Sequence, residues 1–106
     1  MNGFDSFTVV QLRRPADAPD LPDAELERLQ GEHVAFMESL REAGSLLANG
    51  PYRDQEDVSL RGLCIYGVGL EEARALAAKD PLVRAGRLAA DSLTWLVPAG
   101  LLSFGP

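Results

Sequence analysis

The sequence has very few of the residues that hold metals or form disulfides. Its 106 residues contain one cysteine, Cys64, and one histidine, His33. A single cysteine excludes an intramolecular disulfide framework. One histidine and one cysteine also fall short of the four ligands of a structural zinc site, so we expect no metal.

Basic residues are scarce as well. Lys79 is the only lysine, and 10 basic residues against 16 acidic ones give a net charge of −6. Binding to phosphate backbones or anionic membranes depends on clustered Lys and Arg, so we expect neither nucleic acid nor a membrane as partner. No apolar run approaches the roughly 20 residues of a membrane span, and "MNGFDSFTVV" lacks the basic and apolar regions of a signal peptide. We expect a cytoplasmic protein.

The chain has the length and composition of one soluble domain, which we place at residues 1–106. Its apolar fraction is 46% and its charged fraction 25%. β-branched and apolar runs predict strands at 6–14, 45–52, 63–68 and 88–98. Apolar residues at three- and four-residue steps predict helices at 23–43, with Asp23 as N-cap, and at 69–81, stopped by Pro81. The segments 15–23 and 53–62 are expected loops, and the tail 99–106 either adds a short strand or packs on a partner.

This β-α-β-β-α-β order predicts an α+β, ferredoxin-like fold. Right-handed crossovers would place both helices on one face of an antiparallel sheet and leave the other face bare. The predicted strands 63–68 and 88–98 are apolar on both alternating sets of residues. Because a bare apolar face promotes association, we expect a second copy of the sheet to cover it in a homodimer.

His33 lies in the middle of the apolar stripe of the first predicted helix. A lone histidine there is more often a hydrogen-bonded core residue than a catalytic one, and Asp80 before Pro81 is ordinarily a helix stop. Residue spacing alone therefore leaves a structural and a functional interpretation open for both residues.

Two segments carry a resemblance to a known family. The run "EHVAFMESLREAGSLLANGPY", followed by a strand and by "EEARALAAKDPLVRAG", resembles the YCII-related proteins of the dimeric α+β barrel superfamily over residues 28–97. The matching features are His33, Gly44, Gly50-Pro51, Asp80-Pro81 and Gly86. The resemblance implies a His33–Asp80 pair in a pocket between helices and sheet, and sheets paired face to face in a dimer. It also implies kinship with isomerases, monooxygenases and dehydrochlorinase-like enzymes that act on small aromatic or enol-type molecules.

The leading hypothesis is a small, cofactor-free acid-base enzyme. A carboxylate on one imidazole nitrogen fixes the tautomer and leaves the other nitrogen as general base or acid. Neither a G-x-S-x-G elbow nor a Gly-rich phosphate loop is present, so acyl and phosphoryl transfer fit poorly. The expected substrate is a small carbonyl or phenolic molecule. The alternatives are a non-catalytic dimeric module that binds a small metabolite, and an oxygenase like the antibiotic monooxygenases.

Several softer candidates complete the predicted site. Gly50 and Pro51 would form the rim of the pocket through their backbone. Tyr66 would line the pocket or the dimer face, with the core as the alternative. Arg84 and Arg87 would hold an anionic substrate, with ordinary solvated arginines as the alternative.

Overall fold

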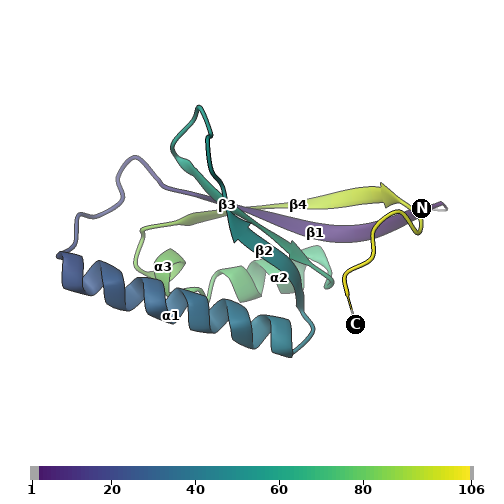
Figure 1. Cartoon of the computed structure of the whole chain (residues 1–106), viewed down its shortest axis with the longest axis horizontal. Coiled ribbons are helices and arrows are strands. Elements are labelled where there is room, and N and C mark those ends of the chain that lie inside the picture. The colour runs from purple at the N-terminus through teal and green to yellow at the C-terminus, as the bar shows by residue number, and fades with distance from the viewer. Residues whose placement is uncertain (1–2, 106) are drawn as a thin grey trace.

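The fold is built from one four-stranded sheet and three helices (Figure 1). The structure is a computed structural model, and residues 3–105 of it are described. The strands are β1 (Phe4–Arg13), β2 (Leu46–Pro51), β3 (Leu60–Tyr66) and β4 (Ala89–Pro98). The helices are α1 (Asp23–Glu42), α2 (Leu70–Ala77) and α3 (Pro81–Arg84).

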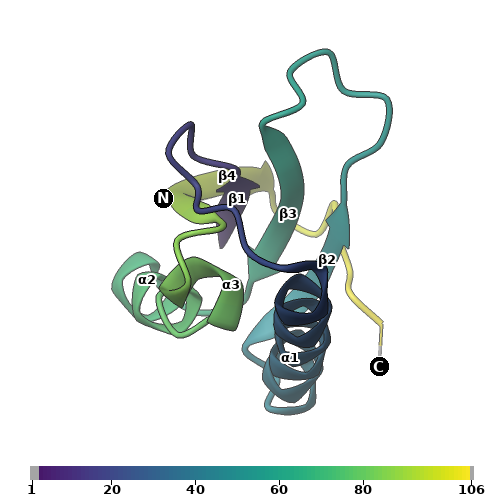
Figure 2. The ribbon, with the colours of Figure 1, turned by 90° about the vertical axis from the view of Figure 1, so that its left-hand side faces the viewer.

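The sheet is antiparallel throughout, with strand order β2-β3-β1-β4. All three helices lie on one face of it (Figure 2). The long helix α1 packs beside β2 and α3, and α2 packs against β1 and β4. This arrangement confirms the predicted α+β, ferredoxin-like fold with its helices on one face.

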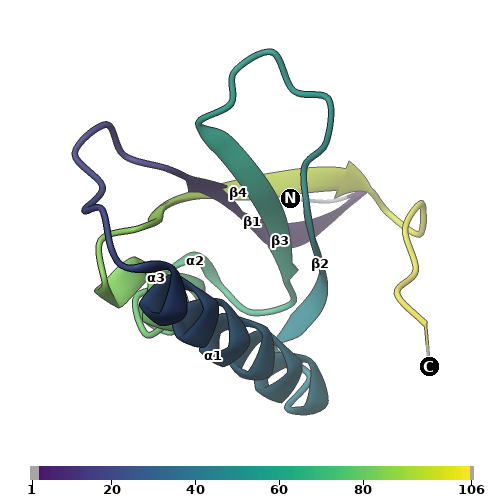
Figure 3. The same ribbon diagram turned by 60° about the vertical axis from the view of Figure 1, so that its left-hand side comes forward.

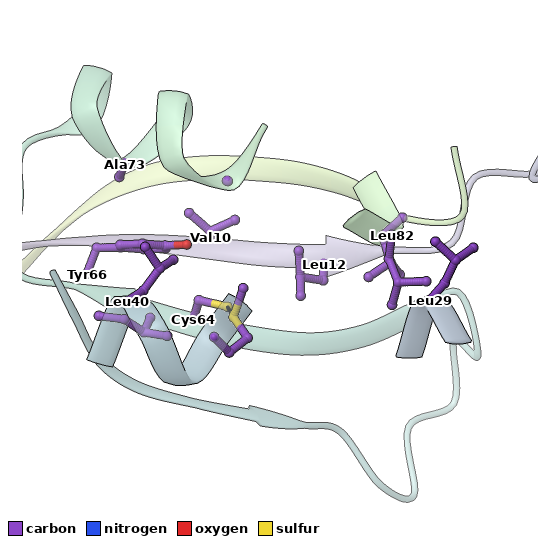
Figure 4. Packing of buried hydrophobic residues seen from close by; sticks show 12 residues of the cluster. Val10, Leu12, Leu29, Leu40, Cys64, Tyr66, Ala73 and Leu82 are labelled. Atoms are coloured by element: carbon purple, nitrogen blue, oxygen red, sulfur yellow. Dashed lines mark hydrogen bonds between the residues drawn. The ribbon is translucent and has the colours of Figure 1, made fainter. Parts of the chain in front are cut away.

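Side-chain alternation along β1 explains how the sheet forms its core. Thr8, Val10 and Leu12 are 3%, 0% and 7% exposed, while the residues between them are only half-buried. Alternate residues of a strand point to opposite faces, so the buried set lies under the helices. In the core, Leu40 and Tyr66 lie at one end, and Leu29 and Leu82 at the other (Figure 4).

The first helix begins and ends within one residue of its predicted bounds. Asp23 is its first residue rather than its N-cap, a position that belongs to Pro22. Because Asp23 makes no capping bond, its negative charge acts only through the helix dipole. At the other end, Gly44 has φ +82°, its N–H bonds Arg41 O, and Ser45 N–H bonds Leu40 O. These two bonds form a Schellman motif, which requires the left-handed backbone that glycine adopts.

The second predicted helix is two helices, which corrects the continuous span expected at 69–81. Helix α2 ends at Ala77, and α3 begins at Pro81 with Asp80 as its N-cap. The Asp80 Oδ1 atom accepts a hydrogen bond from the Leu82 N–H at 2.9 Å. Asp80-Pro81 therefore starts a helix rather than only stopping one, because aspartate is a strong N-cap and proline fits the first helical position.

The connection between β2 and β3 differs from expectation, and the tail up to residue 105 does not form the short strand that was one of its two expected arrangements. Leu60–Gly62, expected in the polar connection, belong to β3 because they pair with β1 and β2. The described part of the tail, up to residue 105, contains no strand. It runs past the end of β4 toward the edge of β2 (Figure 3), and Phe104 packs edge-on against Phe7 with ring centres 5.4 Å apart.

Candidate active site

A pocket of about 290 Å³ lies between α1, the ends of β1, β2 and β3, and the α3 region. Helix α1 contributes Gln30, His33, Val34, Met37 and Arg41, all of which line the pocket. These positions recur at three- and four-residue steps, so they form one stripe of the helix. The same amphipathic pattern that packs α1 on the sheet therefore brings His33 to the pocket.

His33 and Asp80 are in direct contact although 47 residues separate them. The Nδ1 atom of His33 lies 2.7 Å from Oδ2 of Asp80. The imidazole side chain is 14% exposed and the carboxyl side chain 1% exposed. Because the other carboxylate oxygen accepts the Leu82 N–H, both oxygens of Asp80 are engaged and the group is held in place.

This contact determines which imidazole nitrogen is available for chemistry. A carboxylate oxygen only accepts hydrogen bonds, so Nδ1 carries the proton and donates it to Asp80. No group within residues 3–105 forms a hydrogen bond with Nε2 of His33. The arrangement can take a proton at Nε2 and stabilise the resulting imidazolium through the Asp80 carboxylate.

The other reactive groups near the pair are held neutral. Cys64 lines the pocket but is 2% exposed, with Sγ 4.0 Å from Sδ of Met37. Burial, and then the negative charge of Asp80, raises the pKa of the Cys64 thiol to about 12. Burial likewise raises the pKa of the Tyr66 hydroxyl. Since the thiolate is the nucleophilic form of cysteine, Cys64 is a packing residue here.

The pocket includes some of the softer candidates and excludes others. Gly50 and Pro51 line it on β2. Tyr66 is 1% exposed and packs in the core, which is the alternative that the sequence left open. Arg84 and Arg87 are not among the lining residues, and the Arg87 guanidinium bonds the Pro19 carbonyl at 2.8 Å. The backbone carbonyl of Arg87 instead accepts the Nε–H of Arg14, which does line the pocket.

Gly62 shows how closely β2 and β3 approach beside the pocket. A Cβ atom at this position would lie 2.8 Å from the carbonyl oxygen of Gly50, closer than real contacts allow. Only glycine therefore permits the two strands to pair at this point of the pocket wall.

Sequence reasoning missed three arginines that line the pocket: Arg14, Arg41 and Arg61. Arg41 follows His33 by two helical turns, so the stripe pattern could have identified it. No local signal marks Arg14 or Arg61, because each reaches the pocket only through the pairing of β1 with β3.

The described residues provide neither a metal-binding cluster nor a membrane-spanning helix. Among residues 3–105, no group of three His, Cys, Asp or Glu side chains is arranged to hold a metal ion. Across the same part of the chain, no helix has the length and apolar character needed to cross a membrane.

The fold and the pocket together define a ferredoxin-like α+β protein with a histidine–carboxylate pair facing a small pocket. The chain belongs to the YCII-related domain family, whose model matches residues 7–94.

A solved structure agrees with the fold. The 5-chloro-2-hydroxyhydroquinone dehydrochlorinase TftG from Burkholderia phenoliruptrix, solved with 2,5-dihydroxybenzoquinone, is 18% identical with a TM-score of 0.56. That match covers 86% of this chain and 93% of the dehydrochlorinase. A putative antibiotic biosynthesis monooxygenase from Chloroflexus aurantiacus is 17% identical with a TM-score of 0.46, covering 95% of this chain and 100% of the other. No curated protein matches the sequence significantly. At 18% identity the match to the dehydrochlorinase shows the fold alone.

Proposed function

We propose that this protein is a small acid-base enzyme in which His33 is the general base and acid and Asp80 orients it. The observation that carries the proposal is the 2.7 Å contact between His33 Nδ1 and Asp80 Oδ2 beside a pocket that His33 lines. The proposed substrate is a small carbonyl or phenolic molecule, because the pocket volume of about 290 Å³ is at the lower end of the range for ligand pockets.

The proposed chemistry needs only these two side chains. Nε2 of His33 removes a proton from a hydroxyl or carbon next to a carbonyl of the substrate. The released electron pair forms a new double bond. In an isomerisation, the electron pair shifts the double bond within the molecule and His33 returns the proton at another atom. In an elimination, the electron pair expels a leaving group such as chloride. Asp80 stabilises the imidazolium between these steps, and general acid-base catalysis of this kind contributes about 10²- to 10⁴-fold.

The proposed working unit is a homodimer in the cytoplasm. The face of the sheet without helices carries apolar residues that pair across strands, among them Val9, Ile65 and Leu93. Leu93 is 62% exposed and Trp95 39% exposed on this face. A second copy that covers this face would remove that apolar surface from water.

Turnover by wild type and by two variants, His33→Ala and Asp80→Asn, tests the catalytic proposal. The first compounds to assay are chlorinated hydroxyhydroquinones, because the dehydrochlorinase of similar fold is named for such a substrate. Chloride release and the absorbance of the quinone product report the reaction. We expect turnover by wild type and a loss of about 10²-fold or more in each variant.

Two outcomes would contradict the proposal. Turnover that persists in His33→Ala would remove His33 from catalysis. A compound that binds in the pocket and is recovered unchanged, with no turnover across a wider panel of carbonyl and phenolic compounds, would identify a metabolite-binding module instead.

A further inference from the structure

The wall of the pocket is positively charged although the protein as a whole is acidic. Arg14, Arg41 and Arg61 line it, and none of its lining residues within the described range 3–105 is Asp or Glu. The net charge of the chain is −6. The sign of the charge at the pocket is thus opposite to that of the whole molecule.

Among residues 3–105, these three arginines have no carboxylate partner. Elsewhere, Arg13 pairs with Asp91 at 3.1 Å and Arg74 with Glu71 at 2.7 Å. No carboxylate of residues 3–105 lies within 4.0 Å of the nitrogens of the pocket arginines. No ion pair within the part of the chain that the structure describes therefore neutralises their positive charges.

Neutral acceptors hold the three guanidinium groups in position instead. Arg41 Nη1 donates to Asn49 Oδ1 at 2.5 Å, which links α1 to β2. The Arg14 Nε–H donates to the Arg87 carbonyl at 3.2 Å, and Arg61 Nη1 donates to the Val58 carbonyl at 3.1 Å. A guanidinium has five N–H donors, so each arginine keeps donors for a ligand.

The charges around Arg14 also repel one another. Burial lowers the pKa of the Arg14 guanidinium, and the positive charges of Arg87 and Arg61 lower it further. An anion bound among these groups would relieve that repulsion. Arginine is well suited to this role because its planar fork binds carboxylate oxygens in pairs.

We infer that the pocket binds a small organic anion, whose negatively charged oxygens are held by Arg14, Arg41 and Arg61 while its other end lies next to His33. The inference rests on the proposed function only for the role of His33; the binding of the anion is independent of catalysis. It narrows the substrate class from carbonyl and phenolic molecules in general to those that carry a carboxylate or comparable oxyanion.

A matched pair of probes separates charge from shape. 4-Hydroxybenzoate and 4-hydroxybenzamide share a ring and a hydroxyl, but only the first is an anion. NMR titration of wild type follows the amide signals of Gly50 and Gly62, which line the pocket. We expect the acid to bind about tenfold or more tightly than the amide, since a charge-assisted hydrogen bond is about twice as strong as a neutral one.

Three substitutions locate the binding. Arg41→Gln and Arg61→Gln should each lower the affinity for 4-hydroxybenzoate about tenfold. They should leave the affinity for 4-hydroxybenzamide unchanged within about twofold. Both side chains are exposed, so these variants should fold. Arg74→Gln is the control, because it removes the same charge from α2, outside this pocket, where its surface ion pair adds little stability. It should leave both affinities unchanged.

The outcomes are distinguishable from those of the catalytic test. The inference would be overturned if the acid and the amide bound equally, or if the acid did not bind at concentrations up to about 10 mM. It would also be overturned if Arg41→Gln and Arg74→Gln lost the same affinity for the acid. If the acid still bound to His33→Ala, and wild type turned over none of the carbonyl and phenolic compounds, the proposed function would be wrong. The anion site would still be supported.

Discussion

Asp80 serves two partners at once, and its two oxygens can be tested separately. Oδ1 caps α3 and Oδ2 accepts from His33. Asparagine caps helices as well as aspartate does, but it would present an NH₂ group to Nδ1. Nδ1 would then have to accept, which moves the ring proton to Nε2 and removes the base.

Asp80→Asn should therefore invert the His33 tautomer at little cost in stability. We expect long-range ¹⁵N NMR of the neutral ring to show a protonated Nδ1 in wild type and a protonated Nε2 in the variant. The free energy of unfolding should fall by about 1 kcal/mol or less. Asp80→Ala is the comparison and should lose about 2–4 kcal/mol, because it removes both the cap and the buried partner of His33. An unchanged tautomer in Asp80→Asn would contradict the described pair.

Because the Cys64 thiol is buried, we expect the free energy of unfolding to fall at alkaline pH. Its pKa is raised by burial to about 12 in the folded protein, against about 8.5 in an unfolded chain. Below about pH 8.5 the thiol is protonated in both states, so the contribution of Cys64 to the free energy of unfolding is fully present. It is lost as pH rises toward 12, because only the unfolded state releases the proton in that window. Denaturant unfolding between about pH 8 and pH 10 should show a loss of about 1 kcal/mol per pH unit at the upper end.

Cys64→Ala is the control for this measurement. It should remove the slope assigned to the thiol while leaving whatever slope other groups contribute. The same slope in wild type and Cys64→Ala would mean that the thiol is not the group responsible. In the native state, Cys64 should also react slowly with thiol reagents, because it is 2% exposed and protonated.

At the scale of elements, local signals predict the existence of each strand and long helix better than their ends. The apolar stripe around His33 and the glycine at 44 predict α1 because both act within a few residues. The break between α2 and α3 is harder to predict, since Lys79 and Asp80 suit a helix end and a helix start equally well. Asp80 begins α3 by accepting the Leu82 N–H, whereas its contact with His33 joins another element and no local pattern encodes that contact.

Two glycines of the α1 region should respond in opposite ways to alanine. Gly31 is an exposed residue within α1, and a Cβ atom at this position would have no other atom within 4 Å. Gly31→Ala should therefore stabilise the protein by about 0.5–1 kcal/mol. Gly44 also has free space, but its φ is +82°, so Gly44→Ala should destabilise by about 1–2 kcal/mol. Thermal or denaturant unfolding of the two variants measures both signs, and a destabilised Gly31→Ala would contradict the helical geometry at that position.

At the scale of the whole molecule, the sequence predicts the topology but not the composition of the pocket. The order of elements is enough for the ferredoxin-like sheet, because few connections are compatible with it. Arg14 directly follows β1 and Arg61 lies on β3, so they are distant in sequence and reach one pocket only because β1 pairs with β3. Arg87 does not line the pocket although it follows Asp80 closely in the chain, and its guanidinium bonds the Pro19 carbonyl.

The face of the sheet opposite the helices supplies the test of assembly. In the strand register, Val9 lies between Ile65 and Leu93, and Phe7 lies opposite Trp95, so apolar side chains continue across three strands. If a second copy covers this face, a charge at Leu93 would be buried without a partner, which costs several kcal/mol. We expect light scattering of wild type at micromolar concentration to give twice the 11.4 kDa chain mass.

Leu93→Glu should then give the mass of a single chain with an unchanged circular dichroism spectrum, because Leu93 is 62% exposed in the subunit. Val58→Glu is the matched control. Val58 is 72% exposed, and it lies on the connection between β2 and β3 rather than on the sheet face. It should therefore remain dimeric. A wild-type protein with the mass of one chain would refute the dimer, and equal dissociation in both variants would place the interface elsewhere.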